Sequence, residues 1–262
     1  MLSMEDLQKE FPKNLHPFQR NILREYLQYK ILDVLFSQPL GQKLRFIGGT
    51  ALRIVHGLDR FSEDLDFDCV DLSFAKFQTL SGAVKSGLEL EGYEVDISFS
   101  GKTAFRCNIR IPKLLFQHGI LPLEHEKILI QLDTESQGFE FEPTVEFINK
   151  FDVFRPILVT PISILLSQKI VTAFNRRRPK GRDFYDILFL LGKTLPNYEF
   201  LAAKIGVTDS AGLMTYIRKG CAKIDFKELV DDLRPFVFNP SHADRILLFT
   251  AYVETHAGLL EN

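Results

Sequence analysis

The chain has 262 residues, of which 45% are hydrophobic and 25% are charged, with a formal net charge of −2. This composition is typical of a globular protein with a real core, arranged as one large domain or two unequal ones. This net charge excludes a protein that binds nucleic acid through an overall positive charge. The three cysteines have neither disulfide nor zinc spacing, the N-terminus is acidic, and no apolar stretch is long enough to span a membrane, so we expect a cytoplasmic protein without a membrane partner.

The first part of the chain reads as alternating helices and strands. Apolar side chains recur at helical spacing over residues 17–37, and residues 44–47 read as a short strand that enters Gly48-Gly49. A helix over 50–56 and a strand over 61–68 follow. Further on, the pattern predicts a helix over 73–91, a hairpin over 93–99 and 103–111, and strands over 127–133 and 144–149.

The character of the sequence changes at Thr160-Pro161, where a threonine cap and a proline begin a helix. Helices are predicted over 161–175, 183–191, 209–219, 226–233 and 242–257. We therefore expect an α/β (α+β) fold. An α/β domain over 1–158, with an N-terminal helix and a small mixed sheet flanked by helices, is expected before an α-helical domain over 159–262.

A glycine-rich turn, Gly48-Gly49-Thr50, lies where a strand passes into a helix. Glycines permit a phosphate to approach the backbone closely, and the free N–H groups of a helix start favour an anion. Thr50 can cap the helix and offer its hydroxyl to a phosphate oxygen. The alternative is an ordinary strand-to-helix turn.

An acidic pair, Asp64 and Asp66, follows the short helix. Two residues apart on a strand, both carboxylates point to the same side, where their repulsion is relieved by a cation. Hard oxygen ligands suit Mg²⁺, which takes its other ligands from water and substrate phosphates. An acidic, solvated strand edge is the alternative for the pair alone, but a phosphate-binding turn joined to a metal pair is what nucleotidyl transfer requires.

The stretch with GGTAL followed by GLDRFSEDLDFD resembles the AbiEii/AbiGii-type nucleotidyltransferase toxin family, within the polymerase-β-like superfamily. A later helix with Lys169 and the segment GRDFYD, residues 181–186, are similar to the same family. The resemblance spans about residues 46–191. It implies a metal-dependent enzyme that uses Mg²⁺ or Mn²⁺ and an NTP, and a helical domain that completes the NTP cleft.

The superfamily resemblance also implies a third metal-binding carboxylate on a neighbouring strand. Asp133, at the end of an apolar strand, is the candidate, and Asp96 in the predicted hairpin is its rival. A strand-end aspartate that simply begins a turn is the alternative for Asp133.

Lys169 is assigned by the resemblance to the triphosphate or to charge stabilisation during transfer, and a lysine that extends to solvent is the alternative. The basic run over residues 175–183, which includes Arg182, could engage NTP phosphates or an RNA backbone. Asp183 is a candidate catalytic residue or one half of an Arg/Asp pair that joins two helices.

Arg60 and Ser62 are expected on the metal-bearing face with Asp64, where both could bind phosphate. Arg60 could instead pair with Asp64 or Asp66. Asp68 is expected further along the same face, behind the metal ligands.

The resemblance further implies the toxin of a toxin–antitoxin or abortive-infection system, paired with an AbiEi-like antitoxin, with the 3′ end of tRNA as the leading acceptor. Two alternatives stay open. The enzyme could modify a small molecule or a protein, or the chain could be an inactive nucleotide-binding regulatory module.

Overall fold

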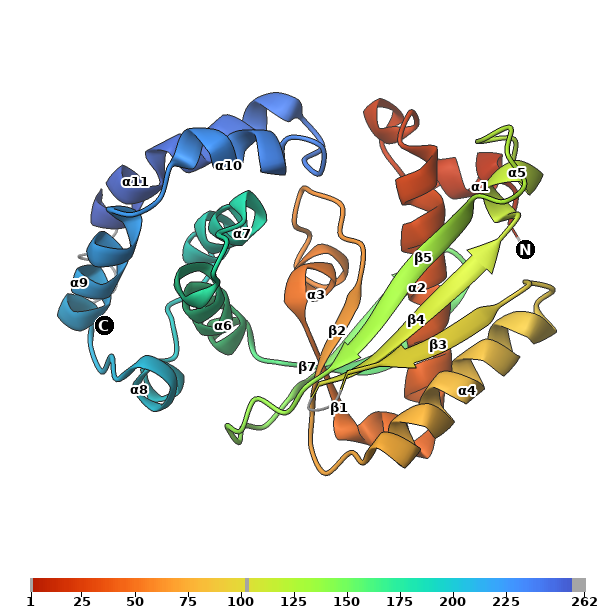
Figure 1. The fold of residues 1–262 in the computed structure, drawn as a ribbon, viewed down its shortest axis with the longest axis horizontal. Coiled ribbons are helices and arrows are strands. Elements are labelled where there is room, and N and C mark those ends of the chain that lie inside the picture. Colours follow the sequence, from red (N-terminus) through yellow and green to blue (C-terminus); the bar gives the residue numbers. More distant parts are fainter. Residues whose placement is uncertain (1, 102–103, 256–262) are drawn as a thin grey trace. The chain divides into compact units, whose positions relative to one another are not determined.

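The computed structural model describes residues 2–101 and 104–255 (Figure 1). Its contacts divide the chain into two compact units. The first unit contains the chain up to Gly57, then Phe61–Gly138 and Glu142–Thr160. The second unit contains Pro161 onward together with two short outlying segments, Leu58–Arg60 and Phe139–Phe141.

The first unit is built on a seven-stranded mixed sheet with the order β3-β4-β5-β2-β1-β7-β6. β1 pairs antiparallel with β2 and parallel with β7, β2 pairs parallel with β5, and the β3–β4, β4–β5 and β6–β7 pairs are antiparallel. The strands are β1 (Leu44–Ile47), β2 (Leu65–Cys69), β3 (Asp96–Ser100), β4 (Phe105–Pro112), β5 (Lys127–Thr134), β6 (Thr144–Lys150) and β7 (Val153–Val159).

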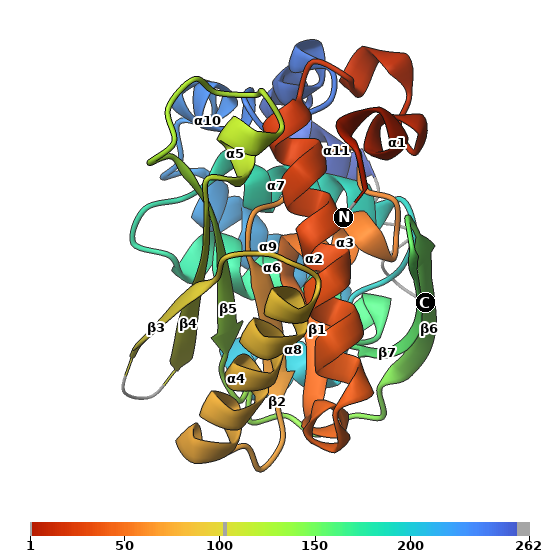
Figure 2. The same cartoon turned by 90° about the vertical axis from the view of Figure 1, so that its right-hand side faces the viewer.

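Helices of the first unit cover one face of this sheet, and α2 and α4 lie against it in Figure 2. The burial of alternate strand residues follows from this arrangement, since Leu65 and Phe67 of β2 and Leu132 of β5 are fully buried. The helices of the unit are α1 (Met4–Lys9), α2 (Gln19–Ser37), α3 (Gly48–Ile54), α4 (Phe74–Leu90) and α5 (Leu114–Gln117), with 3-10 turns at Lys13–Leu15 and Pro39–Lys43.

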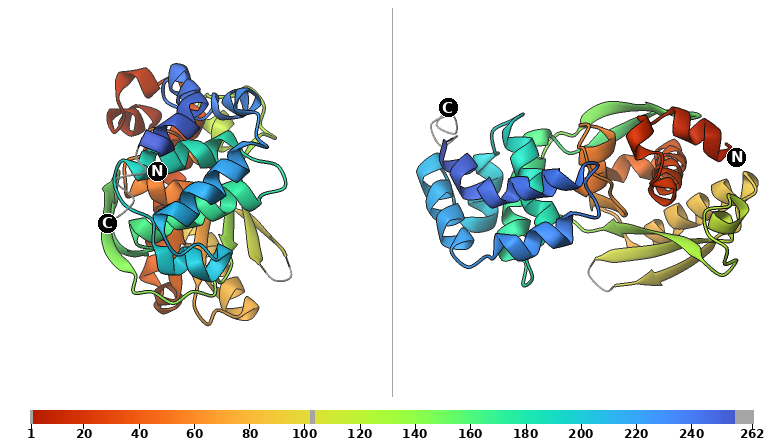
Figure 3. Two further views of the ribbon diagram at one scale, coloured as in Figure 1. Left: turned by 90° about the vertical axis from the view of Figure 1, so that its left-hand side faces the viewer. Right: turned by 90° about the horizontal axis from the view of Figure 1, so that it is seen from above.

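The second unit is helical, and none of the seven named strands comes from its described residues (Figure 3). Its core includes ring contacts among Phe174, Phe184, Phe226 and Phe249. Its elements are α6 (Ile162–Asn175), α7 (Gly181–Leu191), α8 (Tyr198–Ile205), α9 (Ser210–Cys221), α10 (Phe226–Leu233), a 3-10 helix over Pro240–Leu248, and α11 (Phe249–Thr255).

The fold class expected from the sequence is confirmed, and most predicted elements are present within a few residues of their expected bounds. The strand over 44–47 and the helix over 226–233 match β1 and α10 at both ends. Local signals explain this agreement, because Ser73 accepts a hydrogen bond from Lys76 N at the start of α4 and Asp225 caps α10.

Several expectations are wrong in detail. β7 and α8 were not predicted. β7 contains Pro156, but β1 pairs with β7 at Val159, beyond the proline, so Pro156 interrupts little of the ladder on that side. β2 begins at Leu65 rather than at residue 61. The helix expected over 242–257 is a 3-10 helix followed by α11, and residues 102–103 and 256–257 of the predicted elements lie outside the described residues.

Among the described residues, none of the helices combines the length and the apolar character needed to cross a membrane.

Candidate active site

The sheet face opposite α2 and α4 is polar, and it carries the carboxylates predicted as metal ligands. Strand alternation that buries Phe67 and Leu132 turns Asp66 of β2 and Asp133 of β5 to the other face. The polar side chains of neighbouring strands continue this surface, since Gln131 donates a hydrogen bond to Asn108 at 2.9 Å.

Asp66 and Asp133 are directly opposite each other in the parallel register of β2 and β5. Asp64 directly precedes β2, and its Oδ1 accepts a hydrogen bond from the Gln131 backbone N–H at 3.3 Å. The three carboxylates therefore come from the β2–β5 junction. Asp96, the rival candidate, is exposed at the start of the edge strand β3, and two strands separate β3 from β2.

Arg106 of β4 lies across from Asp133 and binds it with two hydrogen bonds, Nε to Oδ1 at 2.8 Å and Nη2 to Oδ2 at 2.7 Å. This fork-to-carboxylate geometry is the strong form of an ion pair. Arg106 was not among the predicted site residues. The available signal was the alternation of Arg106, Asn108 and Arg110 with buried apolar residues, which places all three on the polar face.

Gly48 brings the turn between β1 and α3 into contact with Asp66. Its φ of +80° is in the left-handed region, and a Cβ at this position would lie 2.3 Å from Asp66 Oδ2. Both features require glycine. The open space left by the missing side chain is filled by the carboxylate itself, so the glycine-rich turn and the acidic pair form one structural unit.

Thr50 is fully buried, and its hydroxyl donates a hydrogen bond to the backbone carbonyl of Asp64. This role differs from the phosphate contact expected for the hydroxyl. Thr50 thus fastens the start of α3 to the residue before β2, while Gly49 is buried beside it.

The residues at the β2–β5 junction fit a divalent cation. Burial raises the pKa of Asp64, and the nearby Glu63 and Asp133 carboxylates raise it further, against the opposing effects of the Gln131 N–H and Arg24. A bound cation would relieve this cost. In the described part of the chain no three acidic, histidine or cysteine side chains converge as a ready-made metal site. Asp133 pairs with Arg106 there.

The segment between Arg60 and Asp64 is held by α2 and is not part of β2. Gln28 donates hydrogen bonds to the carbonyls of Ser62 and Glu63 at 3.1 and 3.0 Å, and Arg24 pairs with Glu63 at 2.9 Å. The expectation that Arg60 and Ser62 share a strand face with Asp64 is therefore wrong, since the extended strand begins only at Leu65.

Arg60 belongs to the second unit, where it is 2% exposed and pairs with Asp186 of α7. Its Nε and Nη2 each lie 2.7 Å from an Asp186 carboxylate oxygen. The structure thus gives the Arg60 guanidinium a buried partner in Asp186, which the sequence did not predict.

Lys169 of α6 shares the same carboxylate, with its Nζ 2.7 Å from Asp186 and 3.2 Å from Asp183. Asp183 also pairs with Arg176 at 3.0 Å. Asp183 thus joins α7 to the end of α6, as in the Arg/Asp pair that was the alternative to a catalytic role. Lys169 pairs with carboxylates inside the second unit and does not extend to solvent.

The charges in this cluster stabilise one another. Burial disfavours the charged form of Lys169, but Asp186 and Asp183 outweigh it and leave the lysine pKa above its usual value. Burial likewise disfavours the Asp186 carboxylate, yet Arg60 and Lys169 hold its pKa below the usual range. Asp186 is consequently an ionised carboxylate shared by two cations.

Arg182 lies with its guanidinium 4.1 Å from the centre of the Phe236 ring, within the second unit. This cation–π contact uses part of the basic run for packing.

Asp59, next to Arg60, accepts a hydrogen bond from Tyr185 Oη at 2.7 Å and pairs with His242 at 3.0 Å. The short stretch Leu58–Arg60 is therefore held within the second unit by these pairs.

A model of the family described as nucleotidyl transferase AbiEii toxin of a type IV toxin–antitoxin system matches residues 30–237. The chain belongs to the AbiEii nucleotidyltransferase toxin family. The family-shared GGT, acidic pair, Lys169 and GRDFYD segments all lie inside the matched range. No curated protein matches the chain in sequence.

Solved structures support the fold of this AbiEii-family protein. The crystal structure of JHP933 from Helicobacter pylori is 20% identical, with a TM-score of 0.59 over 92% of this chain and 93% of the other. A second H. pylori protein, described as a candidate nucleotidyltransferase, is 22% identical, with a TM-score of 0.60 over 91% and 95% of the two chains.

Family membership makes this chain a nucleotidyltransferase of a toxin–antitoxin system, with an NTP as substrate and an antitoxin as partner. The carboxylates at the β2–β5 junction and the adjoining glycine turn are the part of the AbiEii-family chain whose chemistry suits that activity.

Proposed function

We propose that this AbiEii-family enzyme transfers a nucleoside monophosphate from an NTP to the 3′ end of tRNA, with Mg²⁺ or Mn²⁺ as cofactor. The observation that carries the proposal is the register of Asp66 opposite Asp133, with Gly48 packed against Asp66. Asp64, two residues before Asp66, adds a third oxygen donor at the same junction.

The reaction joins the acceptor hydroxyl oxygen to the α-phosphorus of the NTP. The bond between that phosphorus and the pyrophosphate oxygen breaks, pyrophosphate leaves, and the hydroxyl proton passes to water. Divalent ions held by Asp64, Asp66 and Asp133 would activate the hydroxyl and neutralise the developing phosphate charge.

The chain's own residues supply position and charge. The backbone N–H groups at Gly48 and Gly49 are the phosphate donors, since the Thr50 hydroxyl is engaged with Asp64. Arg106 pairs with Asp133, and it would become available to a phosphate if that carboxylate held a cation instead. We assign Arg60, Lys169 and Asp183 a positioning role inside the second unit, because their charges are already paired there.

The tRNA acceptor and the cytoplasmic location rest on the family and on two features of the chain. The loop after α6 holds consecutive arginines, Arg176 to Arg178, which suit an RNA backbone. Cys69, Cys107 and Cys221 are free thiols, as expected in a reducing compartment. An AbiEi-like protein is the proposed antitoxin.

The test is to incubate the purified chain with Mg²⁺, each α-³²P-labelled NTP in turn and total RNA, and to separate the products on a denaturing gel. We expect a labelled band at tRNA size that disappears in the Asp64→Ala/Asp66→Ala variant. Asp96→Ala is the matched control, because Asp96 is an exposed aspartate on an edge strand away from the β2–β5 junction, and it should label RNA normally.

Other outcomes contradict parts of the proposal. Label on a protein or a small molecule instead of RNA would replace the acceptor and leave the transfer chemistry in place. NTP binding without pyrophosphate release would indicate an inactive nucleotide-binding module. In cells, expression of the wild-type chain without the antitoxin should arrest growth. Cells that express the Asp64→Ala/Asp66→Ala variant instead should grow normally.

A further inference from the structure

A pocket of about 410 Å³ lies within the second unit, between the end of α6, the loop that follows it, and the second half of α9. Its volume is within the range of about 300–1,000 Å³ that is usual for ligand sites. Its lining residues are Ala173, Phe174, Asn175, Arg176, Arg177, Pro179, Tyr216, Lys219, Gly220, Lys223 and Ile224.

The lining of this pocket is basic, with four exposed cations and no carboxylate. Arg176 pairs with Asp183, whereas no acidic side chain of the described chain forms an ion pair with Arg177, Lys219 or Lys223. Helix C-termini attract cations, which accounts for a basic residue at the end of α6 or α9. It does not account for four cations around one hollow, whose mutual repulsion is relieved when an anion binds.

Aromatic rings form the half-buried part of the lining. The Tyr216 ring meets the Phe174 ring edge-on, with centres 5.6 Å apart and an interplanar angle of 82°. The Tyr216 hydroxyl donates to Asn175 Oδ1 at 3.1 Å, which fixes the ring's orientation. Gly220 permits this packing, because a Cβ there would lie 2.3 Å from Phe174 Cδ1.

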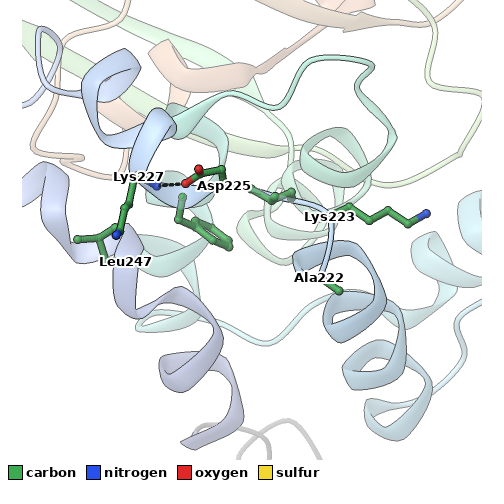
Figure 4. A pocket seen from close by; sticks show the side chains of 7 residues that line it. Ala222, Lys223, Asp225, Lys227 and Leu247 are labelled. Atoms are coloured by element: carbon green, nitrogen blue, oxygen red, sulfur yellow. Dashed lines mark hydrogen bonds between the residues drawn. The ribbon is translucent and has the colours of Figure 1, made fainter.

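A neighbouring depression, lined by Lys223, Asp225, Lys227 and Leu247 among others, differs in charge (Figure 4). Asp225 caps α10 by accepting a hydrogen bond from Lys227 N at 2.9 Å, and it supplies a negative charge. Figure 4 shows the Lys223 side chain extending away from Asp225 and Lys227. The unpaired positive charge is thus concentrated on the side of Tyr216 and Arg177.

We infer that this pocket binds a single-stranded segment of RNA, with backbone phosphates against Arg177, Lys219 and Lys223 and a base stacked on Tyr216. Basic grooves with aromatic platforms are the usual means of holding single strands without reading their sequence. The inference deepens and rests on the proposed function, because it names where the RNA acceptor is held. It assigns α9 to acceptor binding, which no motif of the chain indicates.

The experiment measures the binding of a fluorescein-labelled RNA of about eight nucleotides to the full-length protein by fluorescence anisotropy, in EDTA so that no transfer occurs. The Lys219→Glu/Lys223→Glu variant should bind at least about 10-fold more weakly. Its salt dependence should also be flatter, because each lost phosphate contact lowers the slope of log K against log salt by about 0.7.

The aromatic part is tested separately. Tyr216→Leu should weaken RNA binding by about 10-fold through the loss of stacking, whereas Tyr216→Phe keeps the ring and should bind nearly as well as wild type. Lys227→Glu is the control for charge reversal, because it reverses the charge of one exposed lysine outside the pocket. Melting temperatures of all variants establish that each is folded.

Wild-type affinity in both the charge-reversal and the Tyr216→Leu variants would overturn the inference. So would displacement of the RNA by a free mononucleotide at an equal nucleotide concentration, which would make the pocket a mononucleotide site. The Asp64→Ala/Asp66→Ala variant separates this result from the proposed function. If the pocket variants weaken RNA binding but RNA is never labelled, only the transfer proposal is contradicted. If RNA is labelled and the pocket variants leave the KM for RNA unchanged, only the pocket inference is contradicted.

Discussion

Arg60 and Asp186 form a buried, two-pronged ion pair between segments that are 126 residues apart in the chain, with both N–O distances at 2.7 Å. The arginine lies in the segment between the glycine turn and the acidic pair, and the aspartate ends the GRDFYD segment. Two of the segments that resemble the family are thus joined through charge. This places a structural demand on residues that a sequence comparison alone would assign to catalysis.

Removal of one partner from this pair should destabilise the protein. Arg60→Met leaves Asp186 with Lys169 alone, and Asp186→Leu leaves two cations in a buried site, so each single change should cost about 3–5 kcal/mol in the free energy of unfolding. The Arg60→Met/Asp186→Leu double variant should cost less than the sum of the two. Urea unfolding measures all three.

Arg218→Met is the control for this prediction, because Arg218 pairs with Glu254 at the surface with side-chain exposures of 60% and 45%. It should change the unfolding free energy by less than about 1 kcal/mol. Additive costs in the Arg60 and Asp186 variants would contradict the coupling.

Gly48→Ala should abolish activity and lower stability. The substitution places a Cβ 2.3 Å from Asp66 Oδ2 and forces alanine to a φ of +80°, so both the carboxylate and the backbone must move. Gly57→Ala is a matched control, with a φ of +76° and nothing within 4 Å of the added Cβ. It should cost only the backbone term of about 1–2 kcal/mol and keep NTP-dependent activity. Equal activity of the two variants would show that Gly48 does not support Asp66.

Asp64→Asn should raise the melting temperature in EDTA at neutral pH. The folded state raises the Asp64 pKa, so the native protein retains a proton that the unfolded chain has lost, and wild-type stability falls as the pH rises through the folded pKa. The advantage of the asparagine variant therefore grows above the ordinary carboxyl value of 3.8 and disappears below it. Melting curves at pH 3.5 and pH 7 test the sign, and a gap of the same size at both would contradict it.

Addition of Mg²⁺ or Mn²⁺ at pH 7 should make the melting temperature of wild type higher than that of Asp64→Asn. A cation that binds the native protein stabilises it by mass action, and it binds the ionised Asp64 carboxylate more tightly than the asparagine amide. A cation-induced shift of equal size in both proteins would remove Asp64 from the proposed metal ligands.

Arg106→Met should strengthen Mn²⁺ binding, measured by titration calorimetry in the absence of NTP. The guanidinium competes with a cation for Asp133, and a partly exposed ion pair is worth up to about 1 kcal/mol, which corresponds to roughly a 5-fold change in affinity. Arg110→Met is the control, because Arg110 lies on the same face of β4 but donates to Ser98 at 2.7 Å. Equal gains from both variants would indicate a general effect of charge.

The sequence alone determined the local elements and the position of the acidic pair. Apolar spacing defined α2, and the threonine and proline at residues 160–161 marked the start of α6 to within two residues. The glycine turn and Asp64–Asp66 were found in the same way, because strand alternation and turn chemistry depend on neighbours within a few residues. The family resemblance rests on these short segments, and the family match confirms it.

Only the tertiary structure decided which distant residues meet. The order of strands placed Asp133 rather than Asp96 beside Asp66, and it brought Arg106 to Asp133. Packing of the helical unit gave Arg60 a buried partner in Asp186, which lies 126 residues away in the chain. Strand order and helix packing are set by the burial of apolar surface across the whole chain, and no local periodicity records which charged side chains that burial brings together.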